Sequence, residues 1–168
     1  MKKPAEELRP KKFAHIIGIG NLTRLDDGVA IRIVEKLKEK NLPSNIKVTD
    51  LGTGGLDIIL ALDGWHKGII IDAVDLDFLH PGAIVEYKVK DENIPVIKGL
   101  SSTHGFDAVT ALKLAFSLKD EYVLPSEIII IGIQVKNLDG LGTELSSDVE
   151  IAIPKVIQRI SELLQIEI

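Results

Sequence analysis

Three separated segments carry acidic or imidazole side chains where a strand should end or a helix should begin. Asp26 and Asp27 open one helical pattern, and His104 opens another. Asp72 directly follows three consecutive isoleucines. In an open α/β sheet such positions can meet in a single crevice at the carboxyl ends of the strands. Two carboxylates and one imidazole meeting there would form a ligand set for a divalent transition metal.

Each of these acids also has a plainer interpretation. Asp26 or Asp27 could cap a helix, because a carboxylate accepts the free backbone N–H groups of a first turn. The adjacent acids also allow a division of labour, in which one caps and the other faces the crevice. Asp72 could be a structural carboxylate bonded to loop amides. We expect Asp75 and Asp77, in the following loop, to be solvated.

The four histidines lie in different contexts. His15 falls inside the first expected strand and is predicted to be packed or to face an edge. His66 falls in a turn and is predicted to be exposed, and His80 falls in a turn with no evident partner. A histidine at a helix start is commonly a surface residue, but the expected proximity of His104 to the two acidic loops favours a role as a ligand.

Several other chemistries lack their motifs. The run Gly18-Ile19-Gly20 begins like a dinucleotide fingerprint, but position 23 is Thr where a third glycine is needed. The acids that follow would repel a pyrophosphate. The chain has no Gly-Lys-Ser/Thr phosphate loop, no Gly-x-Ser-x-Gly elbow and no His-Glu-x-x-His. It has no cysteine, which excludes disulfides, thiolate metal sites and a cysteine nucleophile.

The elements that would position these side chains alternate between strand and helix. Nearly continuous apolar runs at 68–74 and 127–133 fit parallel strands covered on both faces. Residues 84–89 instead alternate, as in an edge strand. The pattern predicts a three-layer α/β/α sandwich around a mostly parallel twisted sheet of about five strands, with one antiparallel edge strand. The predicted strands are 13–19, 46–51, 68–74, 84–89 and 127–133, and the predicted helices are 27–40, 56–62, 104–118 and one from 147 onward.

The last predicted helix has two notable local signals. Ser147-Asp148-Val149-Glu150 has the form of a capping box. Pro154 lies inside the helical pattern, and we expect it to kink the helix or to split off a first turn.

Composition limits the class of protein. The 168 residues predict one domain, 13–168, after a solvated lead-in at 1–12. Apolar residues make up 45% and aromatic residues 4%, so the core must be aliphatic. A net charge of −5 argues against a nucleic-acid partner. No apolar run reaches the roughly 18 residues of a membrane span, and residues 1–12 lack the apolar segment of a signal peptide. We expect a cytoplasmic protein without membrane insertion, and we favour a monomer.

Six motifs occur in an order and spacing that are specific together, although each is weak alone. With these motifs the chain, from about Phe13 to about Leu164, resembles the hydrogenase maturation endopeptidases, which trim the C-terminal extension of the large subunit of nickel-iron hydrogenases. The motifs are Gly18-Ile19-Gly20-Asn21 with Asp26-Asp27-Gly28, Asp50-Leu51-Gly52-Thr53-Gly54-Gly55, Ile71-Asp72-Ala73 with Pro81-Gly82, Ser102-Thr103-His104, Gly132-Ile133-Gln134, and Leu145-Ser146-Ser147-Asp148-Val149-Glu150.

The resemblance implies a site and a mechanism. The metal-contacting positions of the family fall on Asp27, Asp72 and His104, and the nickel they contact would belong to the substrate, a large-subunit precursor. That metal would place the scissile peptide and polarise its carbonyl or a water, with a carboxylate as general base. Cleavage would then act as a checkpoint for nickel insertion. Two departures are Asp27, where some members carry Glu, and Ala30, where members often carry Gly.

Three loops of the predicted fold are long. Loops 74–81, 90–103 and 134–146 are long for a compact domain and are predicted to frame a peptide cleft. They could also be ordinary surface crossovers.

One rival function is a non-enzymatic nickel or metal adaptor in hydrogenase assembly that uses the same three residues. Another is a small-molecule hydrolase or phosphorylase, which is disfavoured because no basic phosphate cradle accompanies the glycines.

Overall fold

The computed structural model describes residues 11–90, 94 and 108–168. Within these residues, strands and helices follow each other in the predicted order. One short 3-10 helix is added before the first α-helix. The elements are β1 (Ala14–Gly18), η2 (Leu25–Gly28), α1 (Val29–Lys38), β2 (Ile46–Asp50), α2 (Asp57–Leu62), β3 (Lys67–Val74), β4 (Ile84–Val89), α3 (Ala108–Ser117), β5 (Glu127–Gln134) and α4 (Ser147–Leu164).

The five strands form one mixed sheet. Their spatial order is β2-β1-β3-β5-β4, and every neighbouring pair is parallel except β4 with β5. The alternating strand β4 is the antiparallel edge, as predicted. The strands β3 and β5 lie inside the sheet and are buried along nearly their whole length, which explains their continuous apolar sequences.

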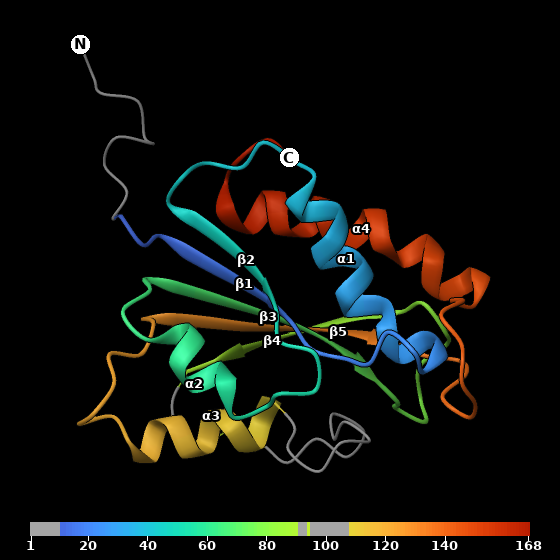
Figure 1. Cartoon of the computed structure of the whole chain (residues 1–168), viewed down its shortest axis with the longest axis horizontal. Coiled ribbons are helices and arrows are strands. Elements are labelled where there is room, and N and C mark those ends of the chain that lie inside the picture. Colours follow the sequence, from blue (N-terminus) through green and yellow to red (C-terminus); the bar gives the residue numbers. More distant parts are fainter. Residues whose placement is uncertain (1–10, 91–93, 95–107) are drawn as a thin grey trace.

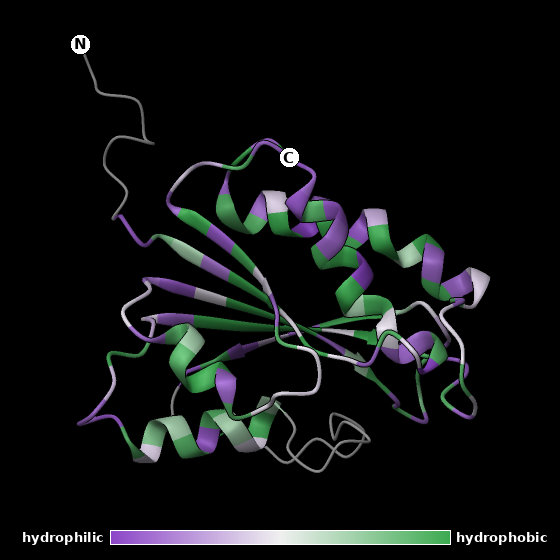
Figure 2. Ribbon diagram, in the orientation of Figure 1, coloured by the Kyte–Doolittle hydropathy of each residue, from purple (hydrophilic) through white to green (hydrophobic). Residues whose placement is uncertain are grey.

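Helices cover both faces of the sheet and complete a three-layer sandwich. Figure 1 shows α1 and α4 on one face and α2 and α3 on the other. Successive strand residues point to opposite faces, so Ile69 and Ile71 pack in the α1/α4 layer while Ile70 packs in the α2/α3 layer. The central strands in Figure 2 are correspondingly apolar. The core is aliphatic, as the composition required.

The start of α4 differs from the prediction. The N-cap is Ser146, one residue before the expected capping box, and no side chain caps the helix. The Ser146 hydroxyl donates instead to the Asp26 carboxylate, at 2.8 Å. The capping box predicted to begin at Ser147 is therefore wrong, because the N-cap is Ser146 and its hydroxyl bonds to a distant acid.

Pro154 does not divide α4. The helix runs without interruption from Ser147 to Leu164. Ile153 and Val156, on either side of the proline, are both buried against the sheet layer. This packing holds the helix together although Pro154 lacks the N–H that an interior helical residue would donate.

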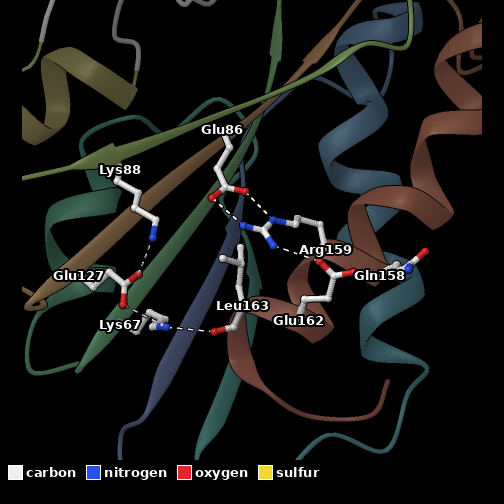
Figure 3. Close-up of polar contacts among 8 residues, drawn as sticks. All are labelled: Lys67, Glu86, Lys88, Glu127, Gln158, Arg159, Glu162 and Leu163. Atoms are coloured by element: carbon white, nitrogen blue, oxygen red, sulfur yellow. Dashed lines mark hydrogen bonds and ion pairs between the residues drawn. The ribbon is translucent and has the colours of Figure 1, made fainter.

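Ion pairs join α4 to the sheet and join two neighbouring strands within it. Arg159 of α4 donates to both oxygens of Glu86 on β4, at 2.7 and 3.1 Å (Figure 3). Lys67 of β3 pairs with Glu127 of β5 at 3.1 Å. These groups are partly solvated, so each pair adds little stability. No helix in the described part of the chain is long and apolar enough to cross a membrane.

Candidate functional site

The loop after β1 folds tightly onto the short helix η2. Gly20 N–H donates to the Gly52 carbonyl at 2.8 Å. A Cβ added at Gly20 would lie 2.1 Å from the carbonyl oxygen of Asp27. Only glycine permits this approach. The glycines that begin like a dinucleotide fingerprint thus serve to bring the loop against Asp27.

Asp27 lies at the end of this loop on η2 and is 3% exposed. Its Oδ2 accepts a hydrogen bond from the Asn21 backbone N–H at 3.0 Å. Neither η2 nor α1 has a side-chain capping bond at its start. The N-cap residues of η2 and α1 are Arg24 and Gly28 rather than either acid, and Asp27 is bonded to the glycine loop.

Asp72 lies on β3, in the middle of the sheet, and is 1% exposed. It shares its strand face with Ile70 and Val74, which pack in the α2/α3 layer. Its register partner on β5 is Gly132. The strand β3 contacts η2 directly. The two buried carboxylates predicted from the sequence therefore lie on two elements that touch near the carboxyl ends of the parallel strands.

Asp26 is fully buried and holds the loop before α4. Its Oδ1 accepts the Ser146 N–H at 2.6 Å, and its Oδ2 accepts the N–H groups of Lys136 and Asn137 at 2.9 and 2.8 Å. With the Ser146 hydroxyl, four donors converge on one carboxylate. Burial raises the pKa of Asp26, but the backbone hydrogen bonds from Ser146, Asn137 and Lys136 outweigh burial and lower it below its ordinary value.

The same two segments are joined by further backbone bonds. Leu25 N–H donates to the Gly142 carbonyl at 2.8 Å, and Gly142 N–H donates to the Thr23 carbonyl at 2.9 Å. The Arg24 guanidinium donates to the Leu138 carbonyl at 3.3 Å. The loop between β5 and α4 is therefore fixed against the segment that carries Asp27. Sequence reasoning missed this role of Asp26, because its partners lie 110 to 120 residues further along the chain.

The described histidines are not placed as ligands. His15 is packed, as predicted: its Nδ1 lies 2.6 Å from the Ala61 carbonyl and its Nε2 lies 2.7 Å from the Thr49 hydroxyl. Burial lowers the pKa of His15. His66 is exposed, as predicted, and His80 is exposed too. His104 lies outside the described residues.

The candidate metal ligands among the described residues are therefore two carboxylates. Among residues 11–90, 94 and 108–168, no group of three or more histidine and acidic side chains is placed to hold a metal ion. Buried carboxylate oxygens at Asp27 and Asp72 suit a divalent cation, and a single imidazole would complete a mixed oxygen and nitrogen set. The assignment of His104 as that imidazole stays a prediction.

Comparison with solved structures defines the class of protein. The fold is that of the hydrogenase-maturing endopeptidases. The Escherichia coli enzyme HybD matches with a TM-score of 0.75 and 21% identity, over 91% of this chain and 92% of that chain. The NiFe hydrogenase maturation protease HybD of Thermococcus kodakarensis matches with a TM-score of 0.73 and 28% identity, over 90% and 99%.

Sequence comparison defines the family. The family model described as hydrogenase maturation protease matches residues 31–163. A Methanocaldococcus jannaschii protein named for the same kind of protease is 37% identical over 152 residues, which cover 88% of this chain and 94% of that protein. The hydrogenase expression/formation protein HoxM of Azotobacter vinelandii is 33% identical over 89% and 70% of the two chains. The chain belongs to the hydrogenase maturation protease family.

Proposed function

We propose that this protein is an endopeptidase that removes the C-terminal extension of a nickel-iron hydrogenase large-subunit precursor after nickel insertion. The supporting observation is the pair of buried carboxylates, Asp27 and Asp72, on contacting elements at the carboxyl ends of the strands. Membership in the maturation protease family supports a peptidase activity. The cytoplasmic location expected from the sequence stays a prediction.

In this proposal the nickel is part of the substrate. Asp27 and Asp72 bind it through carboxylate oxygens, and His104 adds a nitrogen donor. The Asn21 N–H on Asp27 Oδ2 fixes the orientation of that carboxylate before the substrate arrives. The burial of both acids strengthens their attraction for a cation relative to an exposed site.

The chemical step follows from this arrangement. A metal held against the precursor polarises the scissile carbonyl or the attacking water. One of the two carboxylates accepts a proton from that water as it attacks. A precursor without nickel brings no ion to the acids, so it is neither positioned nor cut. Nickel insertion therefore gates processing.

The test is the mass of a precursor before and after incubation with the protein. A nickel-loaded precursor of a nickel-iron hydrogenase large subunit is the substrate. Loss of a short C-terminal peptide, dependent on nickel and abolished by Asp72→Asn or His104→Ala, is the expected result. Tight binding without cleavage would show the non-enzymatic adaptor instead. Turnover of small substrates without nickel would show the small-molecule hydrolase.

A further inference from the structure

A small apolar hollow lies beside Asp72 on the α2/α3 face of the sheet. Its volume is about 160 Å³. One water occupies about 30 Å³ of liquid and pockets for drug-sized ligands exceed about 300 Å³, so the hollow suits a single side chain better than a whole small molecule. Its walls come from β4, β5 and the loop between β3 and β4. The lining residues are Leu76, Phe78, Val85, Glu86, Tyr87, Ile130 and Gly132.

The position of Gly132 connects the hollow to the candidate site. Gly132 is the register partner of Asp72 in the β3–β5 pair, and it also lines the hollow. A Cβ at Gly132 would lie 2.7 Å from Val74 and 2.8 Å from Val85, so these two side chains close in over the glycine. The sheet surface from Asp72 toward the hollow is consequently apolar and spans about two strand spacings, or about 10 Å.

The walls of the hollow are held in place by a buried glutamine. Gln134, at the end of β5, is 4% exposed. Its side-chain oxygen accepts the Leu76 N–H at 2.8 Å, and its side-chain NH₂ donates to Asp75 at 3.2 Å and to the Val135 carbonyl at 3.0 Å. The loop that carries Leu76 is thereby fixed to the sheet. The hollow is a preformed feature, which favours binding because little ordering is needed.

Two more features favour an extended peptide as the occupant. The sheet order ends at β4, so an edge strand lies next to the hollow, and extended peptides bind at such edges with side chains entering pockets. Phe78, on the rim, is 79% exposed. An aromatic side chain this exposed beside an apolar hollow is typical of a contact surface.

We propose that this hollow binds one aliphatic or aromatic side chain of the substrate's C-terminal extension. An extended peptide advances about 3.3 Å per residue, so the bound side chain lies one to three residues from the peptide bond held at Asp72. This subsite rests on the proposed function, because it takes its substrate from there. It adds a source of sequence preference that the metal cannot supply.

The test separates binding from chemistry. Val85→Phe fills the hollow with apolar bulk, and Phe78→Ala removes the exposed rim. The expected result for each is a KM for the precursor raised about tenfold with kcat nearly unchanged, because filling or trimming an apolar pocket changes binding by that order. Ile151→Ala, on the 58% exposed outer side of α4, is the matched control and leaves KM unchanged. Unchanged KM in both pocket variants would overturn the proposal.

A second measurement tests the subsite even if the wild-type protein cleaves no precursor. Absence of cleavage by the wild type would refute the proposed function but not the subsite. A synthetic peptide of the extension is then titrated against isotope-labelled protein, and methyl NMR signals of Leu76, Val85 and Ile130 are followed. Shifts confined to these methyls, lost when the apolar residue of the peptide is replaced by Asp, support the subsite. Shifts elsewhere, or none, overturn it.

Discussion

The two faces of the sheet are formed by the same strands but carry different residues near the strand ends. On the α1/α4 face, β3 presents Ile69, Ile71 and Ala73, and all are buried in one apolar cluster. On the α2/α3 face, the same strand presents Asp72 between Ile70 and Val74. Because alternate residues of a strand point to opposite faces, one strand can present an apolar face on one side and a carboxylate on the other. Both faces carry a buried apolar cluster, but on β3 only the α2/α3 face also carries a buried carboxylate.

The two faces of β5 also carry different kinds of residue. Ile129, Ile131 and Ile133 point into the α1/α4 layer. The opposite face ends in Gly132, which has no side chain and is covered by Val74 and Val85, and in Gln134, which is a hydrogen-bonding group. We therefore expect substitutions on the two faces to separate loss of folding from loss of processing.

The largest expected effect is on the α1/α4 face. Ile131→Ala removes a fully buried side chain from the middle of the cluster. It should lower the free energy of unfolding by about 2–5 kcal/mol, because it combines lost burial with a cavity. Urea denaturation measures this. Processing by the fraction that remains folded should be normal, and its loss there would contradict the division between the faces.

Asp26 should affect both properties. Asp26→Ala leaves four buried or partly buried donors without their shared acceptor, which should lower the free energy of unfolding by about 3 kcal/mol. Processing should fall too, because the loop between β5 and α4 is released from the segment that carries Asp27. Asp26→Asn should retain part of the stability and part of the processing activity. Asp139→Ala, an exposed acid on the same loop, is the control for urea denaturation and the cleavage assay. Equal effects at Asp26 and Asp139 would refute the role of the buried carboxylate.

Asp72 should affect processing alone. Asp72→Asn keeps the shape of the side chain but removes its charge, so it weakens the hold on a divalent cation. Processing should fall at least about 100-fold, equivalent to about 2.7 kcal/mol. Unfolding free energy should change by less than about 1 kcal/mol. Cleavage rates and urea denaturation are compared with Asp77→Asn, an exposed acid in the next loop. A large loss of stability without loss of cleavage would make Asp72 a structural carboxylate.

The smallest expected effect is the ion pair between β4 and α4. The Arg159 hydrogen bond lowers the pKa of Glu86, so the folded protein binds this proton more weakly than the unfolded chain. The stabilisation is therefore present above the unfolded pKa, about 4.3, and is lost as pH falls through the lower folded pKa. A double-mutant cycle of Glu86→Gln and Arg159→Met should give about 0.2–1 kcal/mol at pH 7 and none at low pH. A coupling that grows on acidification would contradict this assignment.

Local sequence patterns predicted most of the fold, since they depend on short-range periodicity. The continuous runs of β3 and β5 and the alternation of β4 were enough to predict the parallel centre and the antiparallel edge. The start of α4 was mispredicted because Ser146 bonds to Asp26, which lies 120 residues earlier. No local pattern contains that information.

The candidate site was predicted only in part. Asp27 and Asp72 could be singled out because acids at the ends of apolar elements are unusual. The role of Asp26 could not, because an isolated sequence does not distinguish the acid that binds backbone amides from the acid beside it. The apolar hollow could not be predicted either, since Leu76, Tyr87 and Ile130 come from three elements and read individually as ordinary core residues.

The long sequence separation of the Asp26 contacts has a consequence for synthesis of the protein. A chain emerges from the ribosome N-terminus first, at about 5–20 residues per second. The partners of Asp26, which are Lys136, Asn137 and Ser146, are made 110 to 120 residues after it. The contacts between the segment carrying Asp27 and the loop before α4 can form only then. A nascent or truncated chain without these residues therefore lacks the hydrogen bonds that fix the loop before α4 to the segment carrying Asp27.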